Sequence, residues 1–144
     1  MSNIDINACT PYREGTHLSF VSSENQCKHI GKNPGRHAVR QFKIDGEVFP
    51  KGTTPQRCDY LLLNDTKKTS YYIELKGSDI PKATQQIDST VAMLSPSLPG
   101  YKIFRRIVYK SGTHKIEESS VLKRRLRYSG TVHIERNQIE ERIS

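Results

Sequence analysis

Alternating apolar and polar positions predict a series of short strands and helices along this chain. The strongest signals are two apolar runs, 57–64 and 71–76, which are typical of buried strands, and the polar link between them suits a hairpin. Residues 80–94 carry apolar side chains at helical spacing after Ser78 or Asp79, either of which can cap a helix. The pattern over 102–110 also predicts a strand, and weaker patterns predict a helix over 17–30, strands over 36–45 and 131–136, and a short basic helix over 119–127.

This order of elements predicts an α/β fold with a central mixed sheet flanked by α-helices. The sheet would consist of a three-stranded antiparallel meander and a further strand, 102–110, that runs parallel to the last strand of the meander. The helix 80–94 would make the right-handed crossover between them. The 144 residues suggest a single domain, residues 1–144, with a core of about 17–110 and a basic C-terminal extension of about 111–144.

The formal charge of +8 arises from 23 Lys and Arg against 15 Asp and Glu, and it favours an anionic partner. The excess is +1 in residues 1–50, +1 in 51–100 and +6 in 101–144, from six against five, six against five and eleven against five charged residues. The nearly neutral charge of residues 51–100 therefore suits a functional site, and the basic C-terminal part suits binding of the anionic partner.

Several classes of protein are not expected. No apolar run approaches the roughly 20 residues of a membrane helix, and the first ten residues have neither the basic start nor the apolar stretch of a secretory signal. The three cysteines include no C-x-x-C pair, so a disulfide framework or a zinc site is not expected. We therefore expect a cytoplasmic protein that does not associate with membranes.

The hairpin predicts that two carboxylates oppose each other. If its loop is residues 65–68, then Asn64 pairs with Thr69, and Asp59 lies opposite Glu74. Opposed residues have Cβ atoms roughly 5 Å apart, where two carboxylates repel each other unless a cation lies between them. Hard cations such as Mg²⁺ take carboxylate oxygens together with waters and substrate phosphates. Asp59 and Glu74 are therefore candidate metal ligands.

Lys76 adds a positive charge to this pair, because it is two residues from Glu74 and so shares its face of the strand. A cation held by the carboxylates would polarise a phosphodiester and help ionise a water, and Lys76 would support that water and the charge that develops in the transition state. The simpler interpretation is an exposed ion pair between Glu74 and Lys76, which would contribute little.

Asp59, the hairpin and Glu74-Leu75-Lys76 resemble the motif of the PD-(D/E)XK nuclease superfamily, whose restriction-endonuclease-like core also has the predicted order of elements. The resemblance covers about residues 17–110 and implies a Mg²⁺-dependent endonuclease, a phosphodiester hydrolase in which Mn²⁺ substitutes for Mg²⁺. It implies metal binding by Asp59, Glu74 and the Leu75 carbonyl, with catalysis assisted by Lys76. Cys58 stands where the superfamily has a proline.

The resemblance also implies two assisting residues outside the motif. An acidic residue on the first helix maps to Glu24, and a glutamine on the helix after the motif maps to Gln86 or its neighbour Gln85, of which Gln86 is favoured by its position beside the sheet. For all three residues, a solvated helix position is the simpler interpretation.

Nucleic acid is the expected partner, with DNA favoured over RNA, and a cutter of duplexes would act as a homodimer. The candidates for phosphate contacts are basic residues near the C-terminus: Arg105, Arg106, Lys123, Arg124, Arg125 and Arg127. The alternatives are a non-catalytic nucleic-acid-binding module of the same fold, an RNA-cleaving toxin or defence nuclease, and a structural or protein-interaction domain.

Overall fold

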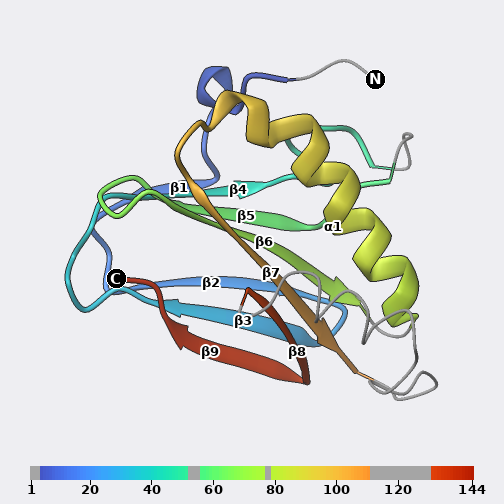
Figure 1. Cartoon of the computed structure of the whole chain (residues 1–144). Helices are drawn as coiled ribbons and strands as arrows, with labels where there is room; N and C mark the ends of the chain where they lie inside the picture. Colours follow the sequence, from blue (N-terminus) through green and yellow to red (C-terminus); the bar gives the residue numbers. More distant parts are fainter. Residues whose placement is uncertain (1–3, 52–55, 77–78, 111–130) are drawn as a thin grey trace.

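The computed structural model describes residues 4–51, 56–76, 79–110 and 131–144. Within these ranges the chain forms two β-sheets and one α-helix, arranged as three layers with the six-stranded sheet in the middle (Figure 1). The elements in chain order are η1 (Ile6–Ala8), β1 (Arg13–Gly15), β2 (Ser19–Glu24), β3 (Cys27–Lys32), β4 (Val39–Lys43), β5 (Tyr60–Asn64), β6 (Thr69–Lys76), α1 (Ile80–Leu94), η2 (Ser95–Ser97), β7 (Lys102–Tyr109), β8 (Val132–Arg136) and β9 (Gln138–Arg142).

The larger sheet has the order β1-β4-β5-β6-β7-β8 and contains the predicted meander. Strands β4, β5 and β6 are antiparallel neighbours, and β7 runs parallel to β6. Asn64 pairs with Thr69 and Tyr60 with Ile73, so the predicted hairpin register is confirmed. The strand predicted over 131–136 is also present, as β8 beside β7.

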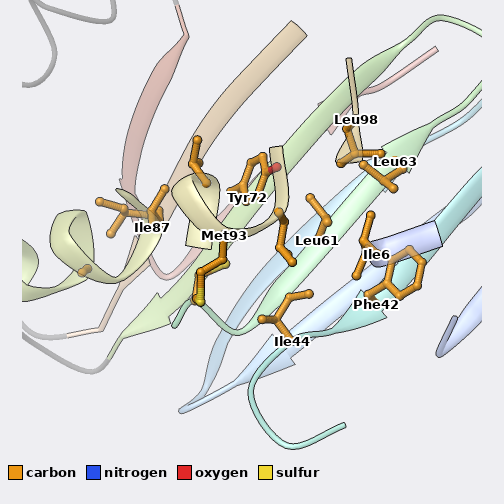
Figure 2. Packing of buried hydrophobic residues seen from close by; sticks show 14 of the residues in the cluster. Ile6, Phe42, Ile44, Leu61, Leu63, Tyr72, Ile87, Met93 and Leu98 are labelled. Carbon is orange, nitrogen blue, oxygen red and sulfur yellow. The ribbon is translucent and has the colours of Figure 1, made fainter. Parts of the chain in front are cut away.

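Helix α1 spans Ile80–Leu94 as predicted and makes the crossover from β6 to β7. Asp79 caps it: its side chain accepts a hydrogen bond from the Lys82 backbone N–H at 3.1 Å. The apolar side of the helix packs on one face of the larger sheet, where Ile87 and Met93 lie in a cluster with Leu61 and Tyr72 (Figure 2). This face of the sheet has the helical cover that the sequence predicts.

The helix predicted over 17–30 is wrong, because these residues form the antiparallel hairpin of β2 and β3. Asn25 and Gln26 form its two-residue turn, with φ of 54° and 61°, the left-handed conformations that such tight hairpins require. The buried positions alternate, with Phe20 in β2 and Cys27 in β3, whereas Leu18 of the supposed helical stripe is exposed. Buried side chains in this segment therefore recur at every second residue, as in a strand, and not every 3.6 residues, as in a helix.

The second sheet has the order β2-β3-β9 and covers the face of the larger sheet that lies away from α1 (Figure 1). Its close approach is visible at Gly31, where a Cβ would meet Leu62 Cδ1 at 3.0 Å. An ion pair joins the two sheets, because Glu141 of β9 accepts two hydrogen bonds from Arg106 of β7, at 2.7 and 3.0 Å.

The fold is therefore mixed α/β, but a second sheet, and not a second helix, covers the other face of the central sheet. The short strands β1 and β9 were not predicted, and the basic helix predicted over 119–127 lies outside the described residues. No helix in the described ranges is long and apolar enough to cross a membrane.

Candidate functional site

Asp59 lies at the point where the chain enters β5, and its backbone is fixed on both sides. Its N–H donates to the Ile73 carbonyl at 3.0 Å, and its carbonyl accepts from the Ile44 N–H at 2.8 Å. Its side chain accepts a hydrogen bond from the Leu75 N–H at 2.8 Å. The residue is only 8% exposed, so this carboxyl is held rigidly and is largely removed from water.

Two other acidic residues act on Asp59. Burial raises the pKa of its carboxyl, the hydrogen bond from Leu75 opposes this, and a hydrogen bond and like charge from Glu24, with the charge of Asp45, raise it further, to about 7. Glu24 reaches Asp59 from the end of β2, not from a helix as predicted. The fold thus brings together two of the predicted site residues, Asp59 and Glu24, although Glu24 lies on a strand and not on the predicted helix.

A hollow of about 360 Å³ opens beside this pair. Lys51 forms an ion pair with Glu24 at 3.0 Å, and the Lys43 ammonium lies 4.7 Å from the centre of the Tyr12 ring. The lining contains four acidic and two basic residues, which gives it a negative formal charge in a chain whose net charge is +8. The lining residues are Ser23, Glu24, Lys43, Asp45, Gly46, Glu47, Lys51, Asp59 and Tyr60.

Glu74 is 2% exposed, and continuation of the β5–β6 register places it opposite Asp59. By strand alternation it shares the face of Tyr72, which is packed under α1. After burial itself, the charge of Glu74 is the largest influence that raises the pKa of the Cys58 thiol, whereas the acidic groups that act most on Asp59 are Glu24 and Asp45. Glu74 therefore adjoins the site on the helix side of the sheet.

The Leu75 peptide between Glu74 and Lys76 is hydrogen-bonded at both ends. Its N–H donates to Asp59, and its carbonyl accepts from the Asn25 side-chain amide at 2.9 Å. Asn25 is the first residue of the β2–β3 turn, so this bond pins the hairpin tip to β6 beside Glu24. Sequence reasoning missed Asn25, because nothing local in the sequence links it to a residue 50 positions away. Lys76 is the last residue of β6 and pairs with Tyr109 of β7.

Gln86 lies on α1 and donates from its side-chain amide to the Arg57 carbonyl at 3.3 Å, two residues before Asp59. Gln85 is exposed. Both line a shallow depression of about 260 Å³ together with Gln56 and Ser89. Gln86 is thus anchored to the segment that leads into Asp59, on the helix side of the sheet.

The described basic candidates are engaged within the chain. Arg106 is 7% exposed and is held by Glu141 and by the Arg105 and Thr131 carbonyls. Arg105 forms an ion pair with Asp88 at 3.2 Å. Their role as phosphate contacts stays a prediction, and so does that of four candidates outside the described residues: Lys123, Arg124, Arg125 and Arg127.

The donor set fits a hard divalent cation in part. Asp59, Glu24 and Glu74 offer carboxylate oxygens, which Mg²⁺ prefers. Within the described ranges no three His, Cys, Asp or Glu side chains are grouped as a metal cage. Mg²⁺ commonly takes only one or two protein carboxylates and completes its shell with waters and substrate phosphates, so a two-carboxylate site suits it.

Comparison with known proteins finds no family model, curated protein or solved structure that matches this chain. The proposed function therefore depends on the geometry of the site and on the motif.

Proposed function

We propose that this chain is a Mg²⁺-dependent nuclease that hydrolyses phosphodiester bonds of nucleic acid, with DNA favoured over RNA. The observation that carries the proposal is a pair of buried acidic residues, Asp59 at the entry to β5 and Glu74 in β6, which continuation of the β5–β6 register places opposite each other, with Glu24 adjoining Asp59. Ionisation of a buried carboxyl is costly, and a divalent cation beside it offsets that cost.

In this proposal Asp59 and Glu74 hold the cation, and Glu24 assists from the hairpin through its contact with Asp59. The cation, when bound, polarises the phosphodiester and lowers the pKa of a bound water. Asp59 is oriented for this role by the Leu75 N–H, which fixes one of its carboxylate oxygens. Lys76 supports the attacking water and the charge that develops on the phosphoryl oxygens. Gln86 acts as a positioning residue, through its bond to the Arg57 carbonyl.

A cleavage screen tests this proposal. Purified protein is incubated in Mg²⁺, in Mn²⁺ and in EDTA with single strands, duplexes and branched junctions of DNA, and with RNA. We expect metal-dependent cleavage that falls by about 100-fold or more in Asp59→Asn and Glu74→Gln. Glu14→Gln, which changes an exposed residue of β1, is the matched control and should cleave as the wild type does. Absence of cleavage of every substrate would overturn the proposal, and cleavage of RNA alone would favour an RNA-directed nuclease.

A second candidate function is non-catalytic binding of nucleic acid by the same fold. The observation that favours it is the Asn25 amide on the Leu75 carbonyl, because the carbonyl that the resemblance assigns to the metal already accepts a hydrogen bond within the chain. This alternative predicts binding of the same affinity in Mg²⁺ and in EDTA, with no cleavage in either. Metal-dependent cleavage would exclude it.

A further inference from the structure

The outward face of the three-stranded sheet is a polar, basic surface. Along β2, β3 and β9 the inward positions are buried or half-buried, and the outward positions are mostly exposed. The strands pack on the larger sheet through the inward side, where they contact β6, β7 and β8. The outward residues, called here the outer face, are Ser19, Val21, Ser23, Lys28, Ile30, Lys32, Gln138, Glu140 and Arg142.

Three cations lie on the outer face with a defined spacing. Lys28 and Lys32 are four residues apart on β3, which is about 13 Å along the strand. Lys32 and Arg142 are paired positions on neighbouring strands, about 5 Å apart between backbones. Glu140 is the one acidic residue among the nine, and it forms an ion pair with Lys32 at 3.0 Å. The outer face therefore has a formal charge of +2.

The outer face is continuous with the hollow beside Asp59. Ser23 belongs to both, because it lines the hollow and pairs with Lys28 on the outer face. Lys28 thus lies at the end of β3 next to the hollow, and Lys32 and Arg142 lie at the far end. A strand of nucleic acid has one phosphate per 3.4 Å of helix axis, so about 13 Å spans roughly four phosphates.

We propose that the outer face binds the phosphate backbone of nucleic acid, with Lys28, Lys32 and Arg142 as the contacts, and directs the strand toward the hollow. The proposal rests on the proposed function for its partner and adds the surface that holds it. Phosphates are recognised mainly by Lys, Arg, Ser and Gln side chains, and these, together with Glu140, are the polar residues that surround Val21 and Ile30 here. Such binding fixes the position of the backbone without reading its sequence.

The test is binding of a fluorescent 20-nucleotide DNA, as a single strand and as a duplex, measured by anisotropy in EDTA over a range of KCl. The variant is the triple replacement of the three contacts by Gln. The matched control replaces three exposed lysines near the β5–β6 turn by Gln, which removes the same charge: Lys67, Lys68 and Lys102. Circular dichroism checks that both variants are folded.

We expect the outer-face variant to bind DNA at least about 10-fold more weakly than the wild type. The slope of log K against log salt concentration should become shallower by about 2 to 3. The affinity of the control variant should change by less than about 2-fold. Glu140→Gln removes the acidic partner of Lys32 and should tighten binding, a gain that unfolding cannot mimic. Equal losses in the two triple variants, or no loss in either, would overturn the proposal.

Two further arms separate this surface from other outcomes. Vesicles of anionic phospholipid are titrated in the same way, and binding to vesicles but not to DNA would overturn the assignment to nucleic acid. Binding in EDTA that depends on the outer face, with no cleavage in Mg²⁺, would support the surface while refuting the nuclease. The failures of the two proposals are therefore distinguishable.

Discussion

Replacement of Asp59 by Asn should stabilise the folded protein above neutral pH. The Asp59 carboxyl is buried beside Glu24 and Asp45, so its ionisation is unfavourable in the fold. An Asn side chain keeps an oxygen that can accept the hydrogen bond from the Leu75 N–H and carries no charge. The substitution thus removes the electrostatic cost and preserves the main contact.

The size and the pH window follow from the pKa. Asp59 has a pKa of about 7 in the fold against 3.8 without it, so the folded state binds the extra proton between these values. The stabilisation of the fold by the protonated Asp59 carboxyl is therefore complete below pH 3.8, and it is lost as the pH rises from 3.8 through 7. The whole difference corresponds to at most about 4 kcal/mol. Asp59→Asn should therefore exceed the wild type in free energy of unfolding at pH 8 by up to about that amount.

Urea denaturation followed by circular dichroism between pH 5 and pH 8.5 measures this effect. The matched control is Asp65→Asn. Burial acts against ionisation of Asp65, but hydrogen bonds from Arg40 and Tyr101 hold its pKa below the ordinary value. The ionised Asp65 carboxylate therefore stabilises the fold above pH 3.8, and Asp65→Asn should destabilise the protein equally across the measured range.

Addition of Mg²⁺ at pH 8 extends the measurement. A cation that binds only the folded wild type stabilises it by about 1.4 kcal/mol at ten times its dissociation constant, and it should not stabilise Asp59→Asn. The reasoning would be refuted if the wild type lost no stability between pH 5 and pH 8, or if Asp59→Asn were less stable than the wild type at pH 8.

The interface between the two sheets gives two further predictions. Gly31→Ala places a Cβ 3.0 Å from a Leu62 methyl group and should destabilise the protein by about 1–3 kcal/mol, which thermal unfolding would detect as a lower Tm; an unchanged Tm would contradict the close approach of the sheets. Glu141→Gln leaves the buried Arg106 without a charged partner and should cost about 3–5 kcal/mol in urea denaturation, whereas Glu140→Gln on the exposed side of the same strand should cost less than about 1 kcal/mol. Equal costs for the two would show that burial does not matter here.

The meander could be predicted from the sequence because its signals are strong and local. Continuous apolar runs and a polar link fix β5, β6 and their register, and apolar spacing with a capping Asp79 fixes α1. The β2–β3 hairpin could not be predicted from such local signals, because its inward positions include Ser22, His29 and Gly31, and its turn has no glycine. Leu18 and Val21, which are exposed, also have the three-residue spacing of apolar side chains on one face of a helix, which favoured the wrong prediction.

The candidate site could be predicted in part for the same reason. Asp59 and Glu74 follow from the hairpin register, which depends only on neighbouring residues. The contacts of Glu24 with Asp59 and of Asn25 with Leu75 depend on how the second sheet packs on the first, which no local pattern encodes. Arg106 illustrates the converse, because a basic residue at a strand position proves to be paired with Glu141 of a strand that was not predicted.

The central claim is that Asp59 and Glu74 hold a divalent cation, and isothermal titration with Mn²⁺ tests it most directly. The account predicts binding to the wild type at pH 8 that is weakened about 10-fold or more by Asp59→Asn and by Glu74→Gln, and that Glu14→Gln leaves unchanged. Absence of binding to the wild type, or equal affinity in all four proteins, would contradict it.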